Sequence, residues 1–256
     1  MISCINTFDH KGKIEINKKL ILAHRGASID AKENTIESFE KAVLLGADMI
    51  EFDVRRTKDN VLIVFHDETI QGYPVKDLTY QAVSQTARDQ GFDLPTVEEV
   101  LKWARGKIKL DVELKEEGYE KEIVELVLGY FEEDRFVMTS FNDASLAVIK
   151  ERYPDIKAGL ILGREMSSYH ILTRFQELFP LKRCKNAKAD FLVAHLKLLR
   201  VGFLDRARRS HLPVFVWMVN DEETIWKLLH DRRVYAIITD KPDLAVSLRK
   251  KALQFS

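Results

Sequence analysis

The sequence has little of what marks several classes of protein. Its two cysteines, Cys4 and Cys184, lie far apart and in no metal-type spacing, so we expect free thiols in a reducing compartment. No run approaches the roughly 18 uninterrupted apolar residues that a membrane helix needs, and residues 1–19 lack the apolar core of a signal peptide. Forty basic and forty acidic residues give zero net charge, which argues against nucleic-acid binding. These absences predict a soluble, cytoplasmic protein.

The length and composition fit one large α/β domain. With 256 residues, 46% of them hydrophobic, the chain is long enough to bury a sizeable core. We therefore interpret residues 1–256 as a single domain. Residues 1–19 are an N-terminal extension. Residues 67–95, where glycine, proline and polar residues loosen the pattern, are a short insertion over the surface.

Short apolar segments alternate with helical patterns along the chain. We predict strands over residues 20–24, 47–54, 107–114, 135–140, 156–162, 190–194, 214–219 and 235–239. We predict helices over residues 33–45, 78–87, 96–103, 119–131, 144–153, 171–181, 203–211, 222–230 and 243–253. Eight strand–helix units in about 250 residues have the size of a closed (β/α)8 TIM barrel. An open doubly wound sheet is the rival, but Gly26 stands alone after the first strand, without a dinucleotide-binding fingerprint.

The second predicted strand carries two acidic residues, Glu51 and Asp53, on one face, because side chains alternate along a strand. The turn at residues 58–60 is too short for a parallel crossover. Residues 61–65 must therefore return as an antiparallel hairpin. Folding back places His66 roughly opposite Asp53, within a residue or two, and beside Glu51.

Carboxylates gather at the ends of the predicted strands, where the active sites of such barrels lie. Glu51, Asp53 and Glu113 offer the hard oxygen ligands that suit one divalent cation, Ca²⁺, Mg²⁺ or Mn²⁺. Zinc is disfavoured, because no cluster of histidines or cysteines has zinc-type spacing. The sequence therefore predicts a metal site of three carboxylates.

Two histidines and two cations accompany these carboxylates. His24 and His66 can serve as general acid and base near neutral pH. Arg25 and Lys115 supply positive charge, and a guanidinium matches a phosphate through paired hydrogen bonds. A divalent metal, two imidazoles and two cations together indicate phosphate ester chemistry, in which negative charge on the phosphoryl oxygens must be neutralised.

The same residues lie in a series of motifs that resembles the glycerophosphodiester phosphodiesterase family, a group of phosphodiesterase TIM barrels related to phosphatidylinositol phospholipase C. The resemblance extends over nearly the whole chain from Leu20 onward. Its motifs are His24-Arg25-Gly26, Glu33-Asn34-Thr35, Gly46-Ala47-Asp48, Ile50-Glu51-Phe52-Asp53-Val54, Thr57-Lys58-Asp59, His66-Asp67, Leu94-Pro95-Thr96, Glu113-Leu114-Lys115, Ser140-Phe141, Trp217-Met218-Val219-Asn220 and Thr239-Asp240-Lys241-Pro242.

The resemblance implies an enzyme that uses a divalent cation to hydrolyse glycerophosphodiesters to sn-glycerol 3-phosphate and an alcohol. It implies that His24 and His66 are the acid/base pair and that Trp217 lines the pocket. It also implies that Glu51, Asp53 and Glu113 bind the metal and that Arg25 and Lys115 hold the phosphate. By the same resemblance, a glycerol hydroxyl of the substrate attacks first and gives a cyclic phosphate that water then opens.

Some positions depart from the family pattern. Lys32 stands where proline is usual, Asn60 where glycine is common, and Met218 where threonine is usual. The family often continues after the histidine matched by His66 with an Asp-Arg-Thr-Thr run, but here Ile70-Gln71-Gly72-Tyr73 follows Thr69. This difference affects which alcohol group the enzyme would recognise. Two alternative functions therefore remain open: a lysophospholipase D acting on lysophospholipids, and a catalytically silent barrel that binds a phosphorylated ligand. The partners expected are a small-molecule substrate and, at most, weak contact with a membrane surface.

Other polar residues have structural interpretations. We expect Asp111, on the same strand face as Glu113 but deeper, to be structural or to support the site. Glu33 and Asn34 are explained equally well by capping a helix or by supporting the site. Thr239-Asp240 is more simply a cap for the final helix, and His195 is expected to be structural.

Overall fold

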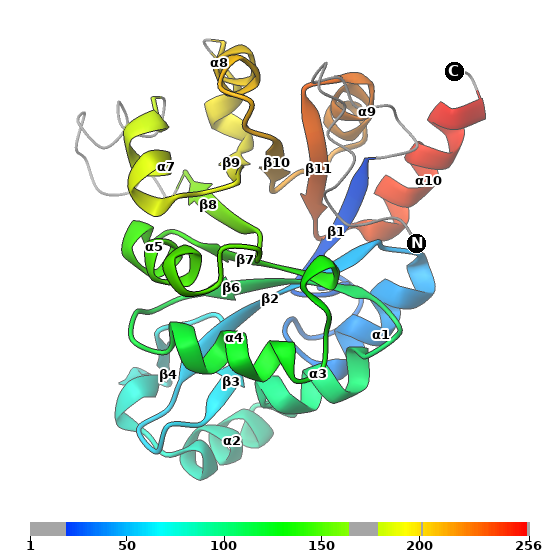
Figure 1. Ribbon diagram of the computed structural model, residues 1–256. Helices are drawn as coiled ribbons and strands as arrows, with labels where there is room; N and C mark the ends of the chain where they lie inside the picture. Colours follow the sequence, from blue (N-terminus) through cyan, green and yellow to red (C-terminus); the bar gives the residue numbers. More distant parts are fainter. Residues whose placement is uncertain (1–18, 164–178, 201, 255–256) are drawn as a thin grey trace.

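A computed structural model of the protein describes residues 19–163, 179–200 and 202–254, and within them eight parallel strands close into a barrel (Figure 1). The strands are β1 (Leu20–His24), β2 (Met49–Arg56), β6 (Lys109–Leu114), β7 (Phe136–Ser140), β8 (Ala158–Leu162), β9 (Phe191–His195), β10 (Val214–Trp217) and β11 (Val234–Thr239). Each pairs with the next, and β1 pairs with both β2 and β11, which closes the ring. The predicted (β/α)8 barrel is confirmed.

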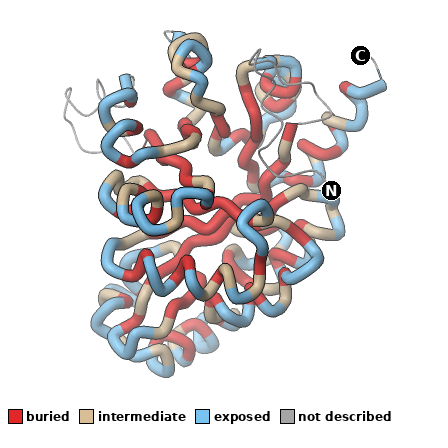
Figure 2. The backbone as a smooth tube through the Cα atoms, viewed as in Figure 1, coloured by how far each residue is buried: buried red, intermediate tan, exposed pale blue. Residues whose placement is uncertain are grey.

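Helices follow the strands and cover the outside of the barrel, with their exposed faces outward (Figure 2). They are α1 (Ile36–Leu45), α3 (Val97–Ala104), α4 (Glu120–Leu128), α5 (Asp143–Arg152), α7 (Leu181–Ala187), α8 (Phe203–Arg209), α9 (Glu222–His230) and α10 (Pro242–Gln254), with 3₁₀ turns at Val75–Asp77, Glu133–Arg135 and Leu196–Leu199. Thr35, Thr96 and Asp221 cap α1, α3 and α9 with their side chains. The predicted helix over residues 171–181 lies almost wholly outside the described residues, and α7 was not predicted.

The antiparallel hairpin after β2 is present as predicted. Strand β3 (Leu62–Val64) runs against β2 with Val64 opposite Val54, and the Phe65 amide donates to the Asp53 carbonyl at 3.0 Å. Asn60 takes the left-handed conformation (φ 62°) in the turn, which asparagine tolerates where glycine is common.

The insertion that follows is more regular than the loose excursion expected from its sequence. It contains a short hairpin that was not predicted, β4 (Thr69–Ile70) with β5 (Tyr73–Pro74). It also contains the helix α2 (Tyr80–Asp89), which confirms the helix predicted over residues 78–87. The insertion also packs a small hydrophobic cluster, made of Ile70, Val75, Val83, Ala87 and Leu94, against Ile63 of β3. It therefore packs as a unit beside β3 rather than lying loosely on the surface.

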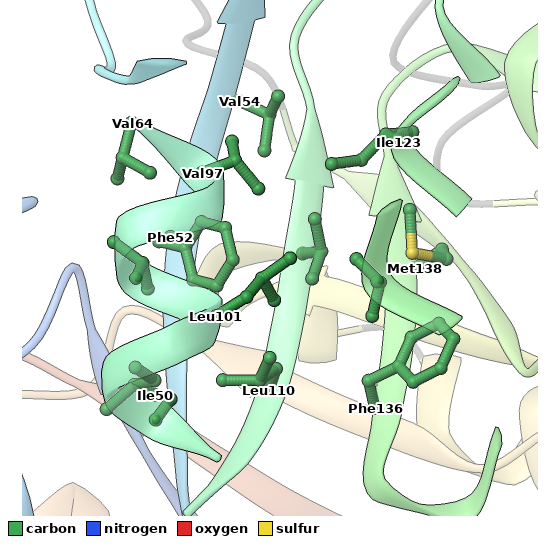
Figure 3. Close-up of a cluster of buried hydrophobic side chains, with 14 of the residues drawn as sticks. Ile50, Phe52, Val54, Val64, Val97, Leu101, Leu110, Ile123, Phe136 and Met138 are labelled. Atoms are coloured by element: carbon green, nitrogen blue, oxygen red, sulfur yellow. The ribbon is translucent and has the colours of Figure 1, made fainter. Parts of the chain in front are cut away.

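Strand β2 shows how alternation divides the barrel wall. Ile50 and Phe52 point outward and pack with Leu101 of α3 in the largest hydrophobic cluster (Figure 3). Their neighbours Glu51 and Asp53 consequently point into the barrel. Burial of the outward row fixes the register of the strand, because a slip of one residue would place the carboxylates among the helices.

Stacked aromatic rings fill the interior below the site. Phe191 of β9 stacks on Phe215 of β10 with ring centroids 4.5 Å apart, and Phe215 stacks on Tyr235 of β11 at 5.6 Å. Gly159 of β8 leaves room for this stack, since a Cβ there would lie 2.3 Å from the Phe191 ring. The three rings thus form a layer, here called the floor, below the residues that line the pocket.

We expect Phe191→Ala to lower the free energy of unfolding by about 3–5 kcal/mol, because it removes a fully buried ring and leaves a cavity in the floor. Urea titration followed by circular dichroism measures the change. Leu44→Ala is the control: Leu44 is 85% exposed and should change stability by less than about 0.5 kcal/mol. Equal losses in the two variants would contradict the assigned floor.

Candidate active site

A cavity of about 880 Å³ opens at the carboxyl ends of the strands. Its lining divides into two sides. Charged and polar side chains from β1, β2, β6 and the hairpin form one side and include His24, Arg25, Glu51, Arg55, His66, Glu113 and Lys115. The other side comes from β7–β11 and the residues that follow them. It includes the apolar side chains of Phe141, Ile161, Val193, Trp217, Met218 and Ile238, beside the polar Thr139, Ser140, Asn142 and Asp143 at the end of β7.

Three carboxylates meet at the polar side, as predicted. One oxygen from each of Glu51, Asp53 and Glu113 lies within 4.8 Å of the others, and all three residues are buried. Burial first, and then the negative charges of Asp53 and Glu113, raise the pKa of Glu51 well above its usual range. The pKa of Glu113 is raised as well, chiefly by burial.

Two cations partly neutralise the carboxylates. Lys115 Nζ lies 2.8 Å from Asp53 Oδ1 and 2.6 Å from Glu113 Oε1, and Arg25 Nε lies 3.1 Å from Asp53 Oδ2. Burial alone would raise the pKa of Asp53, but the charges of Lys115 and Arg25 outweigh it and hold that pKa far below its usual range. Asp53 is therefore ionised and paired, whereas ionisation of Glu51 is unfavourable.

The loop after β1 supports these groups. Asn34, in the left-handed conformation (φ 59°), donates from Nδ2 to Asp53 Oδ2 at 2.7 Å. Glu33 accepts from the Arg25 guanidinium at 2.9 Å, and the Arg25 amide donates to Glu51 Oε2 at 2.9 Å. Glu33 and Asn34 thus support the site, while Thr35 is the residue that caps α1.

The Glu51 carboxylate provides the test of whether the site fits a metal. Glu51 Oε1 is buried and has no hydrogen-bond partner, although such groups are nearly always satisfied. It sits beside two further carboxylates, and the donor set contains only hard oxygen atoms. A divalent cation would both satisfy Glu51 Oε1 and offset the repulsion between the acids. The residues present therefore fit such an ion.

His66 reaches the site from the loop after β3. Its side chain is 34% exposed, its Nδ1 lies 2.8 Å from Asp67 Oδ1, and its carbonyl accepts from Arg55 Nε at 2.9 Å. Desolvation lowers the pKa of His66; the charge of Asp53 raises it, and the charges of Lys115 and Arg25 lower it further. Arg55 was missed in the sequence, where it reads as one more basic residue at the end of a strand.

His24 has a partner that the sequence did not indicate. Its Nδ1 lies 2.7 Å from Asp240 Oδ1, and Asp240 also accepts hydrogen bonds from Ser28 and Asn220. The helix-cap interpretation is wrong for both residues: the Thr239 hydroxyl accepts from the amide of Lys241, which precedes the first residue of α10, and Asp240 accepts no hydrogen bond from that helix's backbone amides. The Asp240 side chain bonds to the rim of the barrel instead of to the backbone of α10.

Trp217 lines the apolar side, as the sequence resemblance implied. Its Nε1 donates to the carbonyls of Leu162 and Val193 at 3.1 and 3.2 Å, so the indole is fixed. Phe141 meets it edge-on at 5.7 Å. His195 packs edge-on against the same indole at 5.1 Å and accepts from a backbone amide, which confirms a structural role.

Asp111 and Cys184 behave as expected from the sequence. Asp111 lies below Glu113 and accepts from the Thr139 hydroxyl at 2.7 Å, and burial raises the pKa of Asp111 to about 7. Cys184 is buried on α7, and burial raises its pKa to about 11, so its thiol is protonated and unreactive at neutral pH. Cys4 lies outside the described residues. In the described part of the chain, no helix combines the length and apolarity that crossing a membrane requires.

Comparisons with known proteins identify the family of the chain. A model of the glycerophosphoryl diester phosphodiesterase family matches residues 24–244. A glycerophosphodiester phosphodiesterase of Bacillus altitudinis is 31% identical over 251 residues, which cover 90% of this chain and 98% of that protein. Human lysophospholipase D GDPD1 is 24% identical over 264 residues, 86% of this chain and 83% of that protein. A crystal structure of a glycerophosphodiester phosphodiesterase from Parabacteroides distasonis superposes with a TM-score of 0.78 at 27% identity, covering 93% of this chain and 99% of the other. The chain belongs to the glycerophosphoryl diester phosphodiesterase family.

Proposed function

We propose that this phosphodiesterase hydrolyses glycerophosphodiesters to sn-glycerol 3-phosphate and an alcohol, with a divalent cation and two histidines. The observation that carries the proposal is the grouping, around one cavity, of three buried carboxylates, two cations and two imidazoles. The family match supports the substrate class. Every position that the chemistry needs is filled, which argues against the alternative of a catalytically silent barrel.

In this proposal Glu51, Asp53 and Glu113 hold the cation, which is Ca²⁺, Mg²⁺ or Mn²⁺. When bound, the cation supplies positive charge to the phosphoryl oxygens of the diester. Arg25 and Lys115 lie directly beside the carboxylates and would pair with the same phosphate. Displacing water from these buried charges would strengthen each contact with the substrate.

His66 is proposed as the general base and His24 as the general acid. The lowered pKa of His66 leaves its ring neutral at pH 7, able to take a proton from the attacking hydroxyl of the glycerol or of water. As the bond between phosphorus and the leaving alcohol breaks, His24, protonated on both ring nitrogens, gives its Nε2 proton to the departing oxygen and is left neutral with its proton on Nδ1. The hydrogen bond from His24 Nδ1 to Asp240 leaves Nε2 as the ring nitrogen free for this transfer.

The apolar side of the cavity favours a second candidate substrate class, lysophospholipids. A deacylated diester is polar throughout, whereas a lysophospholipid adds an acyl chain that needs an apolar surface. Such a surface runs from the buried Ile161 and Ile238, past Trp217, to Met218, which is 36% exposed. The similarity to a lysophospholipase D supports this reading.

One panel of assays tests both candidates. We expect release of glycerol 3-phosphate from glycerophosphocholine, or of lysophosphatidic acid from lysophosphatidylcholine, with at least one of Ca²⁺, Mg²⁺ and Mn²⁺. Absence of turnover on every diester and lysolipid with all three metals would refute the proposed reaction. Tight binding without turnover would instead support the silent-barrel alternative.

Met218→Thr separates the two substrate classes. If the acyl chain lies on the apolar side, this substitution should lower kcat/KM for the lysolipid roughly three- to tenfold, because apolar contact is lost. The effect on the deacylated diester should be smaller. Steady-state rates on monomeric lysolipid and on the matching diester measure the ratio, and an unchanged ratio would exclude Met218 from acyl recognition.

A further inference from the structure

The hydrogen bond between His24 and Asp240 is the starting observation. The two residues are 216 positions apart, but β1 and β11 are neighbours in the closed barrel. Their register places Ala23 opposite Thr239, so the next residues, His24 and Asp240, emerge together at the rim. His24 Nδ1 and Asp240 Oδ1 lie 2.7 Å apart, with the two side chains 11% and 19% exposed.

We propose that Asp240 is a positioning residue that holds His24 in the tautomer with the proton on Nδ1, so that Nε2 faces the substrate. The inference rests on the acid/base role proposed for His24 and adds a residue to that machinery. An ionised carboxylate only accepts hydrogen bonds, so the ring nitrogen facing it must carry a proton. A hydrogen bond with a charged acceptor is shorter and stronger than a neutral one, and it fixes the plane of the ring.

Asp240 is itself fixed from several directions. Asn220 Nδ2 donates to Asp240 Oδ2 at 2.6 Å, and Ser28 Oγ donates to Oδ1 at 3.2 Å. Asn220 Oδ1 accepts from the Asp240 amide at 2.9 Å and from the Thr239 hydroxyl at 3.0 Å. Both carboxylate oxygens are therefore occupied, and rotation of the carboxylate would break two or more hydrogen bonds at once.

The charge of Asp240 is consistent with this role. Burial alone would raise its pKa, but hydrogen bonding and charge from His24, with help from Asn220 and Ser28, lower the pKa of Asp240 below its usual range. The partner of His66 differs: Asp67 is the adjacent residue in sequence, and its side chain is 66% exposed. Of the two histidines that line the cavity, His24 is the one whose carboxylate partner is half-buried and hydrogen-bonded through both oxygens.

The substitution Asp240→Asn tests the role with almost no change in shape. If the new asparagine points its NH2 group toward His24, that group donates to Nδ1 and the proton of the neutral ring must lie on Nε2. If it points its NH2 group toward Asn220 instead, two hydrogen-bond donors face each other. We expect kcat to fall roughly tenfold to a thousandfold, with KM changed less than threefold, because the substrate is still bound but the ring loses the ionised partner that stabilises its proton-donating form and fixes the position of Nε2.

The matched control is Asp221→Asn on the neighbouring rim, where the side chain caps α9 by accepting from the Thr224 amide at 2.9 Å. Asparagine caps a helix as well as aspartate does, so kcat should stay within about twofold of wild type. Thermal melts of both variants separate a general loss of stability from a specific effect on His24.

Nitrogen-15 spectra of the histidine rings give a readout that does not depend on turnover. In spectra recorded at about pH 9, His24, identified by its absence in His24→Asn, should show a protonated Nδ1 in the wild type. In Asp240→Asn it should show a mixture or a protonated Nε2. A wild-type His24 with its proton on Nε2, or a variant with unchanged tautomer and kcat within twofold, would overturn the proposal. If the protein lacked the proposed diesterase activity, the spectra would still show which nitrogen of His24 carries the proton.

Discussion

We expect His66→Ala to lower kcat by at least roughly a hundredfold while the protein stays folded, because the substitution removes the proposed general base. The side chain is partly exposed and fills no hydrophobic core. The segment is anchored by its backbone instead, through the hydrogen bond from Arg55 to the His66 carbonyl, which alanine retains. Steady-state kinetics on the best substrate of the panel, with a thermal melt, measure both quantities.

His230→Ala is the matched control for this substitution. His230 is an exposed histidine at the end of α9, where its Nδ1 contacts only the carbonyl of Trp226 and its ring packs on that residue's indole. We expect kcat to change less than twofold. A His66→Ala enzyme with more than about a tenth of wild-type kcat would remove His66 from the acid/base pair.

The same histidine should set the acidic limb of the pH profile. Desolvation lowers the pKa of His66 below the ordinary value, so the neutral, base-competent ring predominates above that lowered pKa. kcat/KM should therefore hold as pH falls to about 6.5 and decline only below it. The limb should be lost from the residual activity of His66→Ala, whereas a decline that begins well above pH 7 would contradict the assigned environment.

The parts of this protein that could be predicted from its sequence are those set by local patterns. Alternation along β2 placed Glu51 and Asp53 on the inner face, and the short turn before β3 forced the hairpin that returns His66 to the rim. Both inferences use only the period of a strand and the length of a link. The three carboxylates could be grouped for the same reason, because Asp53 and Glu113 end adjacent parallel strands and lie side by side.

What could not be predicted depends on contacts across the closed barrel. The pairing of His24 with Asp240 requires the register of β1 against β11, the first and last strands, and no local pattern encodes that register. Arg55 contacts the carbonyl of His66, a backbone group with no sequence signature. Helix α7 was missed because its residues are mostly polar and only Cys184 and Ala187 are buried. The family resemblance included the motifs that contain His24 and Asp240, but it did not indicate the contact between these two residues.

The second large effect that we expect is loss of all turnover when the divalent cation is removed. EDTA should reduce the rate below detection, and one or more of Ca²⁺, Mg²⁺ and Mn²⁺ should restore it. The same ion should raise the melting temperature of the wild type, since binding to the folded state alone stabilises it. Full turnover in EDTA, with no metal found by elemental analysis, would refute metal dependence.

A pair of isosteric variants, Glu51→Gln and Asp53→Asn, separates metal binding from structural charge pairing. The raised pKa of Glu51 means that its charge opposes folding at neutral pH, whereas the lowered pKa of Asp53 means that its charge favours folding. Without metal, Glu51→Gln should therefore melt at or above the wild-type temperature. Asp53→Asn should lose on the order of 3 kcal/mol of stability, because Lys115 and Arg25 lose a buried partner.

Both variants should lose activity and the stabilisation that metal gives to the wild type, although their stabilities without metal move in opposite directions. That combination is what a metal site with one unpaired and one paired carboxylate requires. Differential scanning fluorimetry with and without each ion, beside rates on the same preparations, measures it. If Glu51→Gln kept the full thermal shift with metal, Glu51 would not be a ligand, and its unpaired oxygen would need another explanation.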